Sequence, residues 1–151
     1  MKIIGIDPGT ACGWAVLDSN GNRLASGVWD LSSKRHEGGG MRFVRARSAF
    51  AELLRTFSPD VVGYEEVRSH RGVSAAHIYG GIVAVVSSEC EEAGIAYTGQ
   101  SVGQIKKFAT GKGNAGKPAM IKAAEERWGP VADDNEADAL WVAEFTRTVL
   151  L

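Results

Sequence analysis

The chain has little of what several classes of protein require. Its 151 residues include two cysteines, Cys12 and Cys90, and three histidines, none at the spacing of a zinc site or a disulfide framework. We therefore expect buried free thiols and a reducing, cytoplasmic location. No uninterrupted apolar run approaches the roughly 20 residues of a membrane span, and a strand pattern begins at once where a leader peptide would stand. We expect no membrane partner.

A net charge of one sign is also missing, because 17 lysines and arginines nearly balance 18 acids. The distribution along the chain is nevertheless uneven. Five lysines and no acid lie within residues 101–122, and five basic residues with one acid lie within 34–47. Acids gather instead at 89–92 and 133–138. Basic segments beside an acidic group favour a metal-dependent nuclease, in which the basic side chains bind phosphates and the acids bind metal.

Hydrophobic periodicity divides the chain into strands and helices. The predicted strands are 2–7, 13–18, 23–29, 61–66 and 95–97, with an Asn-Gly hairpin turn between the second and third. The predicted helices are 41–57, 73–93, 101–109, 117–127 and 134–148. Because no repeat or linker interrupts this order, we predict a single domain over residues 1–151. It should be an α/β fold, with helices flanking a mixed five-stranded sheet whose first three strands are antiparallel.

Four acids stand where a predicted strand ends or the last helix begins: Asp7, Glu65, Asp134 and Asp138. Carboxylates from distant segments converge only where something offsets their repulsion, and oxygen ligands are those that magnesium prefers. Asp138 lies between alanines, which let its helix pack closely on a sheet, where an unpaired carboxylate would be costly. Taken singly, each acid has another interpretation: a turn aspartate, a solvated strand end or a helix cap. Together they predict a metal site.

The same motifs resemble the RuvC family of Holliday junction resolvases. The resembling segments are Ile4-Gly5-Ile6-Asp7-Pro8-Gly9-Thr10, Gly13-Trp14-Ala15, Glu65-Glu66-Val67, Ala137-Asp138-Ala139-Leu140 and the lysine-bearing stretch 110–117. The likeness is greatest to compact bacteriophage or prophage members. It implies a ribonuclease H-like fold and a homodimer, in a bacterial or phage-infected cell, that resolves four-way DNA junctions by paired symmetric nicks. The products would carry 5′ phosphates.

Two magnesium ions, with manganese as a substitute, would complete this centre. Asp7 would bridge the ions, Glu65 would hold one, and Asp138 with Asp134 would hold the other. Adjacent strand residues face opposite sides, so only one of Glu65 and Glu66 can join Asp7, and the resemblance favours Glu65.

The sequence departs from the family pattern in two places. Members usually carry an acid or histidine three residues before the final aspartate, where this chain has Asn135. Asp134 lies one helical turn before Asp138, so we predict it as the substitute ligand, with Asn135 as the alternative. Members also place an aromatic wedge after the glutamate. Here Arg68 and Arg71 follow, and arginine can also stack on bases.

Basic residues complete the predicted site. Lys106 and Lys117 would offset charge on the phosphate in the transition state. The predicted DNA contacts are Arg68, Arg71, Lys107, Lys112, Arg42 and Arg45. A solvated charged loop is the alternative for the lysine segment.

Other functions share part of this pattern. A related nuclease of the same fold could cut other branched DNA or RNA. An actin-like or sugar-kinase-like ATP-binding domain also begins a phosphate hairpin with Asp-x-Gly-Thr, as at residues 7–10. Those proteins need two such domains, however. An inactive DNA-binding module is a further alternative, which the four acids disfavour.

Overall fold

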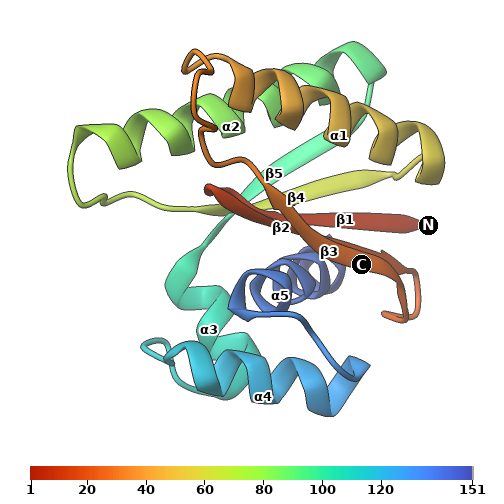
Figure 1. Ribbon diagram of the computed structural model, residues 1–151. Coiled ribbons are helices and arrows are strands. Elements are labelled where there is room, and N and C mark those ends of the chain that lie inside the picture. The colour runs from red at the N-terminus through yellow and green to blue at the C-terminus, as the bar shows by residue number, and fades with distance from the viewer. Residues whose placement is uncertain (151) are drawn as a thin grey trace.

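The computed structural model describes residues 1–150, which form a five-stranded mixed sheet between layers of helices (Figure 1). The strands are β1 (Lys2–Asp7), β2 (Ala11–Asp18), β3 (Arg23–Asp30), β4 (Val61–Glu66) and β5 (Ala96–Ser101). The helices are α1 (Met41–Phe57), α2 (Val73–Ala93), α3 (Val102–Thr110), α4 (Lys117–Trp128) and α5 (Asp134–Leu150). The order across the sheet is β3-β2-β1-β4-β5. The first three strands are antiparallel, whereas β1, β4 and β5 are parallel. The predicted α/β architecture is confirmed.

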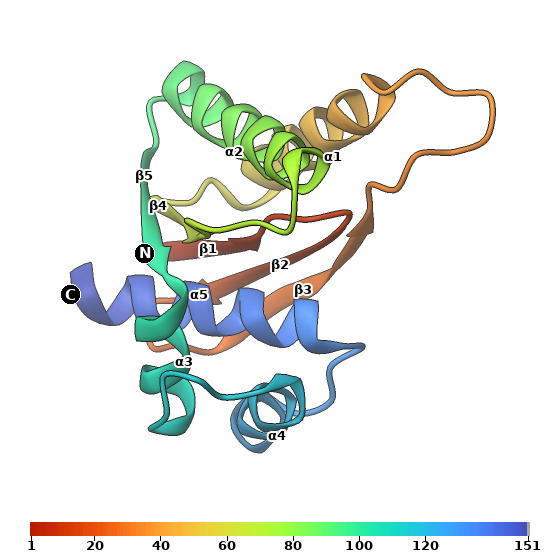
Figure 2. The ribbon, with the colours of Figure 1, turned by 90° about the vertical axis from the view of Figure 1, so that its left-hand side faces the viewer.

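The two faces of the sheet carry separate cores. Helices α1 and α2 cover one face, α5 crosses the other, and α3 and α4 lie beyond α5 (Figures 1 and 2). Strand β1 shows the alternation: Ile4 and Ile6 pack with residues of α1 and α2, while Ile3 packs with residues of α5. Both faces of β1 are therefore buried, which explains why its sequence is an uninterrupted apolar run.

Three strands are longer than predicted, β3 by the single residue Asp30. Strand β2 begins at Ala11 and not at residue 13, and β5 spans Ala96–Ser101 in place of the predicted 95–97. Six successive residues of β5 pair in parallel with Val61–Glu66 of β4. The segment is rich in polar residues and contains Gly99, so its local pattern is weak and pairing with β4 determines its conformation.

The central helix α5 lies very close to the sheet. A Cβ atom at Gly5 of β1 would overlap the carbonyl of Ala139, and one at Gly63 of β4 would overlap the side chain of Thr146. The missing side chains, with the small Ala139 and Ala143 on the helix, permit this approach. As a result, the start of α5 lies beside the carboxyl ends of β1 and β4.

Helix α2 differs from expectation in its overall apolarity. By length and composition it is the one described helix that could cross a membrane. In the fold, 22% of its most apolar 18-residue window is buried. Polar and glycine residues interrupt the apolar sequence of this continuous helix, which is why no long apolar run is visible in the sequence. One such helix is weak evidence for a membrane span. Its inner face packs through Ile82, Val85 and Val86 into the core shared with α1 and the sheet.

Candidate metal centre

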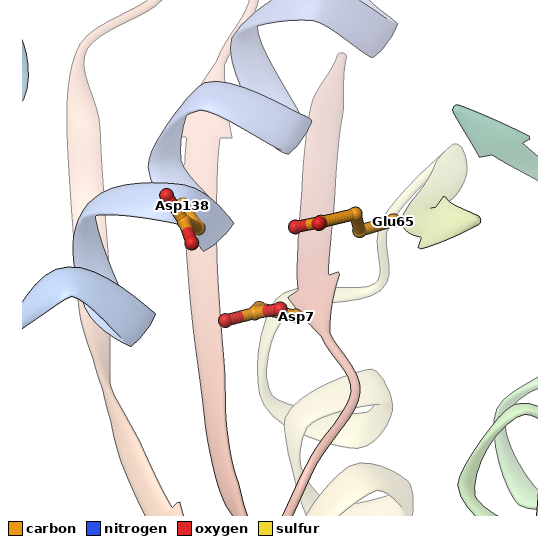
Figure 3. A group of neighbouring side chains, drawn as sticks. All are labelled: Asp7, Glu65 and Asp138. Carbon is orange, nitrogen blue, oxygen red and sulfur yellow. The ribbon is translucent and has the colours of Figure 1, made fainter. Parts of the chain in front are cut away.

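Three acidic side chains from separate elements meet at one end of the sheet (Figure 3). Asp7 ends β1, Glu65 is the next-to-last residue of β4, and Asp138 lies in the second turn of α5. One carboxylate oxygen of each lies within 4.8 Å of those of the other two. Strands β1 and β4 are parallel, with Ile6 beside Tyr64, so the next residues of both strands, Asp7 and Glu65, project from the same end. Segments 58 residues apart in the sequence thus supply adjacent carboxylates.

The electrostatics of this group disfavour three free negative charges. Burial is the main cause that raises the pKa of Asp7 well above its usual value, followed by the charges of Glu65 and Asp138. Burial likewise raises the pKa of Asp138 to about 7, with the charge of Glu65 as the next cause. The pKa of Glu65 is also raised by burial, against the opposing effects of a hydrogen bond with Asp7 and the positive charge of Lys106. Without a bound cation, the three carboxyl groups therefore retain protons at a higher pH than ordinary carboxyl groups do.

A divalent cation would supply the positive charge that these carboxylates lack. The buried Oδ1 atom of Asp138 accepts no hydrogen bond from residues 1–150. Within the same residues, no lysine or arginine nitrogen lies within 4.0 Å of the carboxylates of Asp7, Glu65 or Asp138. A buried carboxylate without a partner is costly, and an all-oxygen donor set suits a hard cation such as magnesium or manganese. The predicted convergence of these three acids is what the structure shows.

Asp134, the fourth predicted ligand, lies near the compact group but outside it. Its negative charge contributes to the raised pKa values of Asp7 and Asp138. Its Oδ2 atom is 3.8 Å from Nζ of Lys117, whose side chain is 80% exposed. The charges of Lys106 and Lys117 act on Asp138 in the opposite direction and lower its pKa. The charges of both predicted catalytic lysines therefore act on the acidic group, and the role of these lysines stays a prediction.

Comparison with known proteins identifies the family. The sequence profile described as crossover junction endodeoxyribonuclease RuvC matches residues 3–143. The chain belongs to the RuvC family. The RuvC of Anaeromyxobacter sp. (strain Fw109-5) is 32% identical over 148 residues, which are 95% of this chain and 71% of that protein. The RuvC of Heliobacterium modesticaldum is 30% identical over 151 residues, with 95% and 91% covered.

Solved structures agree with the sequence comparison. Thermus thermophilus RuvC in complex with a Holliday junction substrate matches with a TM-score of 0.84 and 25% identity, over 99% of this chain and 96% of that one. The yeast mitochondrial Holliday junction resolvase Ydc2 matches with a TM-score of 0.64 at 12% identity, which shows a shared fold. The resemblance and the ribonuclease H-like fold are confirmed, and the chain is a crossover junction endodeoxyribonuclease of the RuvC family.

In this RuvC-family chain Glu65, and not Glu66, joins Asp7. The Glu66 side chain lies instead at a cleft of about 670 Å³ formed where β4 and β5 end, together with Arg68 and Gln104. The Nε atom of Arg68 is 3.6 Å from Oε1 of Glu66. Arg68 and Arg71 are exposed in the segment that joins β4 to α2.

The other predicted DNA contacts fall into two sets. Lys107 and Lys112 are exposed at the end of α3 and just beyond it, in the same segment as Lys106. Arg45 of α1 is instead engaged within the protein, because it donates to Oε1 of Glu37 at 2.7 Å and to a main-chain carbonyl at 2.6 Å. Arg42 likewise donates to the hydroxyl of Ser33. These two arginines secure the segment 31–40, and their contact with DNA stays a prediction.

Sequence reasoning missed Glu136, which it interpreted as one of several acids at a helix start. The residue is 7% exposed. Its carboxylate accepts hydrogen bonds at 2.6 Å from the hydroxyl of Ser26 and at 2.6 Å from the amide of Ala132. Asp133 is the helix cap, as predicted, since it accepts from the amide of Glu136 at 3.0 Å. Glu136 thus fixes the first turn of α5 against β3. A partner 110 residues away leaves no local signal in the sequence.

Proposed function

We propose that this RuvC-family enzyme resolves four-way DNA junctions by two symmetric nicks that leave 5′ phosphates. It would act as a homodimer in the cytoplasm of a bacterial or phage-infected cell, with residues 1–151 as one nuclease domain. The observation that carries the proposal is the convergence of Asp7, Glu65 and Asp138 at the sheet end in a chain of this family. The likeness to a RuvC bound to a Holliday junction supports the choice of substrate.

The residues divide into ligands and phosphate contacts. Asp7 would bridge two magnesium ions, Glu65 would hold one, and Asp138 with Asp134 would hold the other. Bound at this position, magnesium, or manganese in its place, would supply an activated water for in-line attack and charge stabilisation at the leaving oxygen. Asp7 and Glu65 are held on adjacent parallel strands, so little rearrangement is needed for them to act together.

Basic side chains from two segments would hold the DNA backbone. Lys106 and Lys117 already act electrostatically on Asp138, so a scissile phosphate beside that carboxylate would lie within their field. Arg68 and Arg71 lie in the exposed segment after β4, and Lys107 and Lys112 lie on the α3 side. DNA bound at the acidic group would therefore have both basic segments available for contacts with its phosphates.

Helix α2 supplies the surface for a homodimer. His77, Gly80, Ala84 and Ser88 recur every three or four residues on its exposed side. Apart from the nearby backbone of α2 itself, no atom of residues 1–150 lies within 4 Å of the position that a Cβ atom would take at Gly80, whereas at Gly81 that position meets the ring of Phe43. A glycine in a helix interior costs about 1 kcal/mol relative to alanine. Contacts within residues 1–150 do not explain a glycine at position 80. Close approach of α2 from a second copy of the chain would explain it, because a side chain there would keep the two helices apart. Sedimentation of Gly80→Leu tests it, since a monomer is expected.

The direct test of function compares substrates of equal sequence. A labelled four-way junction, a replication fork and a linear duplex are each incubated with the protein and magnesium, and the nicked strands are separated on denaturing gels. We expect paired nicks at symmetric positions in the junction and no cleavage of the duplex. Cleavage of the fork in preference to the junction would favour the wider branched-DNA function, which Arg68 in place of an aromatic wedge also permits.

A further inference from the structure

The hydroxyl of Tyr79 contacts the main chain of the metal site from the far layer of the fold. Tyr79 lies in the second turn of α2. Its hydroxyl donates a hydrogen bond to the carbonyl oxygen of Glu65 at 2.9 Å and accepts one from the amide of Val67 at 3.0 Å. One side-chain oxygen therefore bridges the backbone on both sides of Glu66.

This bridge lies where the pairing of β4 with its neighbouring strands ends. Glu65 and Glu66 pair with Gln100 and Ser101 of β5, and the chain then leaves the sheet without further strand pairing. Buried main-chain amides and carbonyls need partners. The Tyr79 hydroxyl supplies both partners, in the way that another strand would. It thereby fixes the backbone from which the Glu65 carboxylate projects.

The tyrosine itself is held in place. Its ring packs against His70, which lies in the segment between β4 and α2, with ring centroids 4.9 Å apart and planes tilted by 45°. Its backbone belongs to a 21-residue helix anchored in the core by Ile82 and Val86. The bridge thus joins a rigid helix to a strand end, and it also sets the start of the segment that carries Arg68.

We propose that Tyr79 is a positioning residue of the metal centre, which holds Glu65 in the orientation that binds the cation. The inference rests on the proposed role of Glu65 as a metal ligand. Groups that orient a ligand without touching the metal commonly change metal affinity or activity by about 10–100-fold when they are removed. Tyr79 is not itself a ligand, because its oxygen is engaged with the backbone on both sides.

The test removes one hydroxyl oxygen. Tyr79→Phe keeps the ring and its contact with His70, and Tyr97→Phe is the matched control. The Tyr97 hydroxyl also links α2 to a neighbouring strand, by a 2.8 Å hydrogen bond to Glu91, which is not one of the predicted metal ligands. Manganese binding to the DNA-free protein is measured by electron paramagnetic resonance, and single-turnover junction cleavage is measured beside it. Thermal unfolding without metal reports any general loss of stability.

We expect Tyr79→Phe to lower manganese affinity and cleavage rate by about 10–100-fold. Tyr97→Phe should leave both unchanged. Replacement of Tyr79 by para-aminophenylalanine, which retains a polar hydrogen-bonding group, should recover manganese binding if the phenylalanine variant has lost it. A Tyr79→Phe protein that binds manganese and cleaves like the wild type would overturn the inference.

Glu65→Gln, assayed in parallel, separates this inference from the proposed function. If Glu65→Gln cleaves the junction at the wild-type rate, the assignment of Glu65 as a ligand fails, and the role of Tyr79 fails with it. If Glu65→Gln is inactive while Tyr79→Phe is unaffected, the metal centre stands and only the role of Tyr79 is rejected.

Discussion

The backbone of Gly13 in β2 lies directly against the main-chain carbonyl of Asn135 in the first turn of α5, so that a Cβ atom at position 13 would overlap it. This contact sets how close the start of α5 can come to the sheet. Asp134 and Asp138 lie on either side of Asn135 in the sequence. The absence of one side chain in β2 therefore determines where two predicted metal ligands stand.

Gly13→Ala tests this relationship. The added methyl group should push the first turn of α5 from the sheet, at a cost of about 1–3 kcal/mol in the free energy of unfolding. Magnesium-dependent cleavage should fall as well, because Asp138 moves relative to Asp7. Gly39→Ala is the control, since apart from its chain neighbours no atom in the described part of the chain lies within 4 Å of its Cβ position. Urea unfolding and junction cleavage give both readouts, and equal behaviour of the two variants would refute the close-contact argument.

Asp134→Ala should raise the magnesium concentration that gives half-maximal cleavage, by about tenfold if one carboxylate ligand is lost. Asn135→Ala should change it much less, because the observed contact of Asn135 with the sheet is made by its main-chain carbonyl. The measurement is a magnesium titration of single-turnover cleavage. A larger shift for Asn135→Ala than for Asp134→Ala would show that Asn135, and not Asp134, is the fourth ligand.

Lys106→Ala and Lys117→Ala should each slow cleavage by about 10–100-fold, because a positive charge beside the phosphate is lost. Lys34→Ala should have little effect, since that ammonium pairs with Asp30 at 2.6 Å in the segment before α1. Junction binding should also weaken as salt rises, with a shallower slope for each phosphate contact removed. A wild-type affinity that does not respond to salt would contradict the basic-segment account.

The stability of the metal-free protein should depend on Asp138. Its pKa is raised to about 7 in the folded state from an ordinary 3.8. Between these pH values the folded state retains a proton that the unfolded state releases, so stability falls as pH rises from about 4 to 7. Asp138→Asn should flatten this dependence and exceed the wild type at pH 8 by about 1–3 kcal/mol.

Urea unfolding in chelator at several pH values measures this effect, with the exposed Glu126→Gln as a control. Magnesium should reduce the advantage of Asp138→Asn at pH 8, because the cation stabilises the ionised wild type. If the wild type gained stability from pH 4 to 7 in chelator, ionisation of Asp138 would not destabilise the folded state as argued.

Sequence patterns predicted the convergence of the three acids because these residues stand at or near element ends. Asp7 follows an apolar strand, and Glu65 follows another. Parallel strands place their carboxyl ends together, so the pairing of β1 with β4 was enough to bring these two residues side by side. Asp138 was identified by its alanine neighbours, which the close packing of α5 explains.

Contacts between distant residues were not predictable in the same way. The hydrogen bond of Ser26 with Glu136 and that of Tyr79 with the Glu65 carbonyl join residues whose local patterns are ordinary. The extent of β5 was missed for a related reason, since pairing with β4 forms that strand despite its polar sequence. Arg45 illustrates the converse: a basic residue predicted to contact DNA has two partners within the protein.

Single-turnover cleavage of a synthetic four-way junction by Asp7→Asn, with junction binding measured in parallel, tests the central claim most directly. Asp7 lies in the acidic group, and we propose it as the ligand shared by both ions. Cleavage in magnesium should be abolished, while binding should be retained or strengthened because one negative charge near the phosphates is gone. Cleavage by Asp7→Asn at close to the wild-type rate would contradict the account.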